Sequence, residues 1–237
     1  MQVSWYEQSL ADVPEDQRWL SEWERMHVER LCIPKRRSDW LLGRWTAKRA
    51  LAETLGWTSV PERLARIEVW PAVSGAPQPF VDGSPAAFAI SLSHAGGHAA
   101  CAVGPADAAV GCDLEVVEPR SNAFIADFFT AEEQTSLQQV PEDGRAELIA
   151  AIWSAKESAL KAMHVGLRVD TRSVAVAFDD QLQFAKNTIQ VTAPYSQEDV
   201  QWHVFSVRYE GSLLRFGYWF SQETLVRTLV CFPSNSL

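Results

Sequence analysis

Apolar residues recur every three or four positions in some stretches of this chain and every second position in others. The first spacing predicts helices, which we place at 15–31 after Pro14, at 36–55 before Gly56, from about 131, and at about 144–164. Alternating or continuous apolar runs predict strands at 67–70, on both sides of a turn within 88–104, and at 108–117. Five short segments near the end predict an antiparallel sheet: SVAVAF, TIQVTA, WHVFSV, LRFGYWF and TLVCF.

The order of these elements predicts the fold class. Helices, a Pro/Gly loop at 71–79 and strands are followed by a strand, helices and more strands. This order indicates an α+β protein with two lobes of similar size, which we divide into 1–107 and 108–237. A chain of 237 residues is long enough for such a division. The halves resemble each other in element order and not in sequence.

The helix at 144–164 contains the stretch IWSAKESALKA, in which Lys156 falls on the apolar stripe. Glu157 lies at the edge of that stripe, and Lys161 follows one turn later. As a surface pair, Glu157 and Lys161 would contribute only about 0.3–0.5 kcal/mol. The head of Lys156 either reaches a ligand while its stem packs, or pairs with a buried acid.

The strand segment GCDLE contains a second pair of charges. Asp113 and Glu115 are two residues apart, so both side chains project from the same face of a strand. Adjacent carboxylates repel unless a cation lies between them, and Mg²⁺ suits one or a few carboxylates together with phosphate oxygens. The alternative is a solvated strand end that carries two acids.

Two further groups of residues are candidates for anion binding. Ser93 and His94 end a strand just before the turn at Gly96 and Gly97, where backbone N–H groups are exposed. A capped loop histidine explains His94 equally well. On the helix at 36–55, Arg37, Arg44 and Lys48 form one stripe, which faces either an anion or solvent.

Composition excludes several classes of protein. The net charge of −9 and a pI near 5.1 argue against general nucleic-acid binding. No apolar run reaches the length of a membrane span, and the N-terminal segment lacks the pattern of a secretory signal. The four cysteines form no CxxC pair, and those in apolar runs are expected to be reduced and buried, as in a cytoplasmic protein.

The segments VGCDLE and IWSAKESALKA together resemble the signature of the 4′-phosphopantetheinyl transferases. That family has V/I-G-x-D-x-E followed by F/W-S/C/T-x-K-E-S/A-x-x-x-K. The upstream SLSH segment ending at His94, and Gly43-Arg44 with Lys48, are also similar to family segments. The resemblance spans residues 35 to about 170. Size and element order point to the monomeric, Sfp-like branch, a pseudo-dimer of two similar α/β lobes.

The resemblance implies an enzyme that transfers the phosphopantetheine arm of coenzyme A to a serine of an apo acyl or peptidyl carrier protein, with 3′,5′-ADP as by-product. It implies Mg²⁺ held by Asp113, Glu115 and Glu157. It also implies that Lys161 neutralises the diphosphate. Glu157, acting directly or through a metal-bound water, is the candidate general base; Glu133 is another acid in the region, but its capping-box role explains it. The implied contacts to coenzyme A phosphates come from Ser93, His94, Arg44 and Lys48; Arg37 joins them by its place on the stripe, and Lys156 joins them if its head reaches ligand.

Two departures from the family pattern stand out. Many members carry a basic residue between Gly and Pro in the loop after the first strand, but this chain has Ala76 there, so that phosphate contact is missing or supplied elsewhere. Cys112 replaces the usual Ile or Val with a side chain of similar volume.

Two other functions remain as alternatives. A carrier-binding module without chemistry would be expected to have lost a carboxylate or Lys161. An unrelated magnesium nucleotide hydrolase would be expected to carry a phosphate loop of the GxxxxGK[ST] or GxGxxG type, and none is present.

Overall fold

A computed structural model describes residues 1–178, 190–192 and 201–234 of the chain. Its strands are β1 Gln2–Ser9, β2 Ile67–Pro71, β3 Pro77–Val81, β4 Ser84–Pro85, β5 Phe88–Ala95, β6 His98–Pro105, β7 Ala108–Val116, β8 Val174–Ala177, β9 Gln190–Thr192, β10 His203–Tyr209, β11 Ser212–Gln222 and β12 Leu225–Pro233. Its helices are α1 Glu22–Glu29, α2 Pro34–Thr54, α3 Pro61–Leu64, α4 Asn122–Phe128, α5 Ala131–Gln139 and α6 Glu142–Ala162, with 3₁₀ turns η1 Leu10–Asp12, η2 Gly166–Arg168 and η3 Thr171–Ser173.

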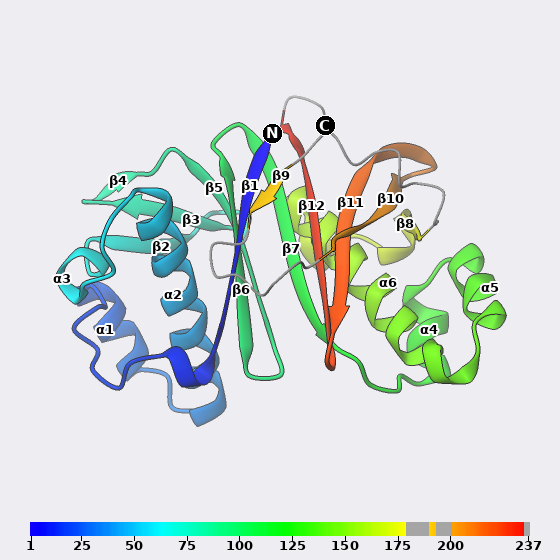
Figure 1. Ribbon diagram of the computed structural model, residues 1–237, viewed down its shortest axis with the longest axis horizontal. Coiled ribbons are helices and arrows are strands. Elements are labelled where there is room, and N and C mark those ends of the chain that lie inside the picture. Colours follow the sequence, from blue (N-terminus) through cyan, green and yellow to red (C-terminus); the bar gives the residue numbers. More distant parts are fainter. Residues whose placement is uncertain (179–189, 193–200, 235–237) are drawn as a thin grey trace.

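The fold is α+β, as predicted, and consists of two lobes that meet along their sheets. The first sheet has the strand order β5-β6-β1-β9 and the second β7-β12-β11-β10-β8. Figure 1 shows these sheets side by side in the centre, with α1–α3 on the outer side of the first and α4–α6 on the outer side of the second. A small third sheet, β2-β3-β4, lies beside the first lobe's helices.

Three apolar clusters hold this arrangement together. One lies between α2 and the first sheet and includes Trp19, Leu51 and Ile67. Another lies between α6 and the second sheet and includes Phe129, Leu160 and Phe205. The third joins strands of both sheets and contains Val3, Trp5, Ala102, Val110, Cys112, Leu114 and Leu229. An ion pair between Glu7 of β1 and Arg227 of β12, with oxygen–nitrogen distances of 2.6 and 2.7 Å, also connects the two sheets.

The longest helices, α2 and α6, contain a short repeat that the prediction of dissimilar halves missed. Both have 21 residues, and Lys48 and Lys156 are each the fifteenth. The segment Trp45–Lys48 reads WTAK, and Trp153–Lys156 reads WSAK. The halves are therefore similar in sequence over this stretch.

Most predicted elements are confirmed, with shifts at their ends. The helix expected at 15–31 begins only at Glu22, because the capping box of Ser21 and Glu24 starts it there. The helices expected at 36–55 and 144–164 are α2 and α6, and Thr130 with Glu133 caps α5 as predicted. Strands β1 and β3 and helix α4 were not predicted. The Pro-rich segment that forms β3 had been assigned to the loop at 71–79.

The predicted C-terminal antiparallel sheet is largely confirmed. Strands β8, β10, β11 and β12 pair antiparallel, and β12 pairs with β7. The segment TIQVTA was assigned to this sheet, and that assignment is wrong for its described part. Residues 190–192 form β9, which pairs parallel with β1 at the edge of the first sheet. The rest of that segment lies outside the described residues.

Candidate functional site

Three charged side chains from β7 and α6 converge where these elements pack together. Lys161 donates to Asp113 Oδ1 at 2.6 Å and lies 3.7 Å from Glu157 Oε2. Lys161 also donates to the carbonyl of Cys112 at 3.1 Å. The ammonium of Lys161 therefore lies between the two carboxylates that sequence analysis had placed near it.

The close packing of α6 on β7 depends on Gly111. A Cβ atom at this position would lie 1.9 Å from the carbonyl oxygen of Ser158, which is a forbidden overlap. The absence of a side chain allows the helix to approach the strand, and it brings Glu157 and Lys161 within reach of Asp113. The close approach of α6 to β7 thus explains why the VGCDLE segment has a glycine at position 111.

Asp113 is almost completely buried, with 2% of its surface exposed. Its Oδ1 accepts hydrogen bonds from Lys161 and from the hydroxyl of Ser93 on β5, at 2.7 Å for the latter. Its Oδ2 is buried and has no hydrogen-bond partner among the described residues. A buried carboxylate oxygen without a donor is costly, and a bound cation or water would relieve that cost.

Glu115 and Glu157 lie at the rim of the same cluster. Burial and, after it, the negative charge of Asp113 raise the pKa of Glu115 to about 7, against the opposing effect of the guanidinium of Arg120. Arg120 donates to Glu115 Oε2 at 3.1 Å. Burial, followed by the charge of Asp113, also raises the pKa of Glu157. The ion pairs of the described residues set three carboxylates, of Asp113, Glu115 and Glu157, against the two cations Lys161 and Arg120, so negative charge is in excess here.

The negative charges that disfavour the ionised forms of Glu115 and Glu157 favour the charged form of Lys161. Burial by itself would lower the pKa of its ammonium, but attraction to Asp113, Cys112 and Glu157 outweighs burial and the pKa is raised. Lys161 stays protonated, with charge available for an anion next to the cluster.

A cavity of about 360 Å³ adjoins Lys161. The first lobe contributes the loop Ser74–Pro77 and β5 residues 90–92 to its walls. The second lobe contributes Lys161, residues 164–166 and Arg168. The cavity thus lies between the lobes, and Lys161 is the residue of the charged cluster that lines it.

The basic stripe on α2 belongs to a different network, centred on Glu24. Lys48 is fully buried and donates to Glu24 and to the carbonyls of Trp19 and Leu64, the latter two at 3.0 Å. Arg44 lies 3.9 Å from Glu24 and stacks over Trp40. The contacts of Lys48 occupy all three of its N–H donors. Burial lowers the pKa of the Arg44 guanidinium.

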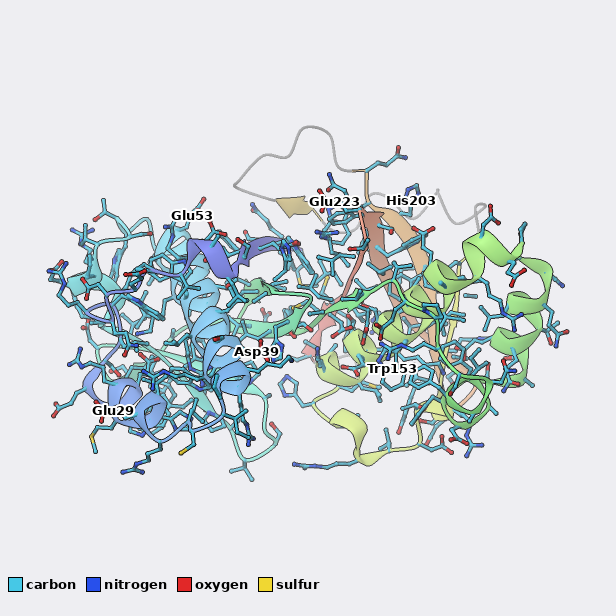
Figure 2. The ribbon with its side chains drawn as sticks, turned by 90° about the horizontal axis from the view of Figure 1, so that it is seen from below. Glu29, Asp39, Glu53, Trp153, His203 and Glu223 are labelled. Carbon is cyan, nitrogen blue, oxygen red and sulfur yellow. The ribbon has the colours of Figure 1, made fainter. Side chains whose placement is uncertain are left out.

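Lys156, Arg37 and His94 also lie apart from the charged cluster. Lys156 is fully buried and pairs with Glu133 at 3.0 Å, so of the two alternatives open from sequence the structure favours the buried acid. Arg37 donates to the carbonyl of Val28 at 3.1 Å. His94 is exposed at the end of β5. Figure 2 labels Asp39 on α2 and Trp153 on α6, which mark one helix of each lobe.

Sequence reasoning missed two contributors near the site, Ser91 and Arg120, and one in the separate network on α2, Glu24. The hydroxyl of Ser91 accepts the backbone N–H of Cys112, which fixes β5 against β7. Arg120 covers Glu115, and nothing in the sequence pattern singled it out. Glu24 could have been found, because Ser21 and Glu24 form the same capping pattern as Thr130 and Glu133.

As they stand, no three His, Cys, Asp or Glu side chains within the described ranges are arranged closely enough to hold a metal ion. Two of the three expected ligands, Asp113 and Glu157, are bridged by Lys161, and Glu115 is bridged to Arg120. Cys101 and Cys112 are free and buried, as predicted. No helix in the described part of the chain has the length and apolar character that crossing a membrane requires.

One comparison with known proteins, the match to a family model, covers this cluster. Residues 109–213 match the sequence model of the 4′-phosphopantetheinyl transferase superfamily, a span that is less than half of the chain and includes the four charged residues of the cluster and its rim. A search of curated proteins returned no match. Among solved structures, the crystal structure of holo-[acyl-carrier-protein] synthase (AcpS) from Neisseria meningitidis is similar, with 17% identity and a TM-score of 0.37 over 52% of this chain and 94% of that chain.

Proposed function

We propose that this chain is a Mg²⁺-dependent 4′-phosphopantetheinyl transferase of the monomeric, Sfp-like type. It moves the phosphopantetheine arm of coenzyme A to a serine of an apo acyl or peptidyl carrier protein and releases 3′,5′-ADP. The observation that carries this proposal is the position of Lys161, between Asp113 and Glu157 and on the wall of the cavity between the lobes. The superfamily match over residues 109–213 supports it.

In this proposal the two lobes have different tasks. Residues 1–107 contribute contacts to coenzyme A, among them Ser93 and His94. Residues 108–237 contribute the carboxylates and Lys161. The location of the cavity supports this division, because its walls come from both lobes while the charged cluster comes from β7 and α6.

The cluster fits a hard divalent cation. Asp113, Glu115 and Glu157 offer only carboxylate oxygens, which Mg²⁺ prefers. The unpaired Oδ2 of Asp113 and the raised pKa values of Glu115 and Glu157 indicate negative charge that Lys161 and Arg120 do not fully balance. These three residues would hold Mg²⁺, which when bound neutralises charge on the diphosphate oxygens as a Lewis acid.

The chain's own residues then account for positioning and proton transfer. A carboxylate whose pKa is raised toward neutrality is suited to accept a proton, so Glu157 takes the proton of the carrier serine. The serine oxygen forms a bond to the β-phosphorus of coenzyme A, and the bond from that phosphorus to the bridging oxygen breaks. Lys161 stabilises the charge that develops on the departing 3′,5′-ADP, and Asp113 holds Lys161 in place.

The test is incubation of the protein with apo-carrier protein, coenzyme A and Mg²⁺, followed by intact-mass measurement of the carrier. We expect the carrier to gain the mass of one phosphopantetheinyl group. Asp113→Asn and Glu157→Gln should abolish the gain while the circular dichroism spectrum stays unchanged. No gain across fatty acid, polyketide and peptide carriers would contradict the proposal. Release of 3′,5′-ADP without any carrier would indicate a hydrolase instead.

A further inference from the structure

Arg168 lies at the mouth of the cavity, in the 3₁₀ turn η2 that follows α6. Its Nη2 donates to the carbonyl of Ser74 in the β2–β3 loop at 3.3 Å, a contact that crosses from the second lobe to the first. The side chain is exposed. The guanidinium of Arg168 therefore lies where the two lobes meet beside the cavity, next to the loop that contains Ala76.

This loop carries no cation, and the two cations Arg44 and Lys48 of α2 do not reach the cavity. Ala76 lines the cavity and carries no charge. Lys48 has its three donors occupied in the buried network around Glu24, and Arg44 is stacked on Trp40 and also faces Glu24. Neither side chain is among the described residues that line the cavity.

Among the described residues that line the cavity, Lys161 and Arg168 carry the permanent positive charges. Lys161 is engaged by Asp113 and Glu157. In the proposed function it is the cation that receives the diphosphate end of coenzyme A. Arg168 is within ion-pair distance of no carboxylate in the described part of the chain. Its planar fork of N–H donors matches a phosphate group, and its long hydrogen bond to Ser74 is weak.

We propose that Arg168 binds the 3′-phosphate of coenzyme A and makes the protein selective for coenzyme A over its 3′-dephospho form. This inference rests on the proposed function, because it takes coenzyme A as the ligand of the cavity. The diphosphate and the 3′-phosphate are attached to different positions of the ribose. Lys161 and Arg168 likewise line the cavity beside different neighbours, Lys161 beside the carboxylates and Arg168 beside the β2–β3 loop, so one cation is assigned to each group.

The experiment is a calorimetric cycle with two proteins and two ligands. Wild type and Arg168→Met are each titrated with coenzyme A and with 3′-dephospho-coenzyme A in the presence of Mg²⁺. We expect Arg168→Met to lose about 10-fold or more in affinity for coenzyme A, as for the loss of a charge-assisted hydrogen bond. Its affinity for the dephospho form should change less than about 2-fold on the same reasoning, because no bond to that ligand is lost. Arg168→Lys, which keeps the charge without the fork, should lie between.

Arg172→Met is the matched control. Arg172 is an exposed arginine four residues further on, paired with Asp170 at 2.7 Å and outside the described lining of the cavity. The variant removes the same charge, and we expect it to bind both ligands as wild type does. Equal losses for both ligands in Arg168→Met, or no loss for either, would overturn the assignment of Arg168 while leaving transfer by wild type intact. Absence of transfer by wild type would contradict the proposed function itself.

Discussion

Helices α2 and α6 occupy corresponding places in the two lobes and share a buried core. Each places a lysine at its fifteenth residue, fully buried and paired with the capping-box glutamate of a preceding short helix. Each lysine also donates to two backbone carbonyls. Each helix has a buried tryptophan three residues before that lysine. The common part is therefore a structural unit that anchors a long helix to its surroundings.

The helices differ at the positions next to that unit. The residue after the lysine is Arg49 in α2 and Glu157 in α6, and the residue five positions after it is Glu53 in α2 and Lys161 in α6. Only α6 faces a strand with carboxylates at the contact, Asp113 and Glu115 of β7. The comparison teaches that a buried anchor can be retained in both lobes while the chemistry is confined to a few residues of one.

The largest effects on stability should come from breaking the two anchors. Lys156→Met leaves the carboxylate of Glu133 buried without its cation, and we expect a loss of about 3–5 kcal/mol in the free energy of unfolding. Lys48→Met should cost somewhat less, because Arg44 lies 3.9 Å from Glu24 and partly replaces the missing charge. Urea denaturation of both variants measures the two losses.

The double variant Lys156→Met/Glu133→Gln tests the cause of that loss. The backbone N–H groups of Thr130 and Val176 donate to different oxygens of Glu133, and a neutral amide keeps one of these acceptors. Part of the stability should therefore return, because no unpaired charge is left buried. A loss below about 1 kcal/mol in Lys156→Met would show that the buried pair is not an anchor.

The next effect concerns activity and contrasts Lys161 with its counterpart Glu53. Lys161→Met removes the cation next to Asp113, and we expect transfer to the carrier to fall about 10²–10³-fold, as for the loss of one group that stabilises a developing charge. Glu53 is exposed on the first lobe, as labelled in Figure 2, and Glu53→Gln should leave the rate within about 2-fold of wild type, as is usual for surface positions. Similar rates for the two variants would contradict the confinement of the chemistry to α6.

The sequence predicted α6 and its charged residues well because local signals coincide there. The periodicity of apolar residues defined the helix, and the spacing of Asp113 and Glu115 assigned them to one strand face. Prediction from sequence failed where contacts between distant parts of the chain determine the structure. The partner of Lys156 comes from α5, 23 residues earlier, and that of Lys48 from α1, 24 residues earlier. Periodicity identifies a lysine on an apolar stripe but not the acid that meets it.

The pairing of β9 with β1 lay beyond sequence reasoning for a related cause. Alternating residues predict a strand, but they carry no information on which sheet it joins. The segment at 190–192 pairs parallel with the N-terminal strand, from which most of the chain separates it in sequence. Strand β1 was missed as well, so the first lobe's sheet was incomplete in the prediction and offered no edge for the pairing.

The variant Gly111→Ala tests the contact between β7 and α6 and should affect stability and transfer together. The added methyl group meets the backbone of α6, which cannot move aside as a side chain can, and we expect a loss of about 3 kcal/mol with transfer nearly abolished. Gly104→Ala in β6 is the control. Its Cβ would approach Val110 Cγ2 at 2.9 Å, a flexible side chain, and about 1 kcal/mol should be lost with the rate retained. Thermal unfolding and carrier transfer measure both variants, and equal losses in the two would contradict the reason given for Gly111.

The last effect is the pH dependence that Glu115 confers on the second lobe. Its pKa is raised to about 7 in the folded protein by burial and by Asp113, from an ordinary value near 4.5, so folding favours the protonated form. The resulting loss of stability is absent below about pH 4.5 and complete above about pH 7. In metal-free buffer, wild type should therefore lose stability relative to Glu115→Gln as the pH rises from 5 to 8, and Mg²⁺ should reduce that loss. Glu118→Gln, which changes an exposed acid paired with the same Arg120, should follow wild type. Parallel melting curves for wild type and Glu115→Gln across this range would show that the rim of β7 carries no excess negative charge.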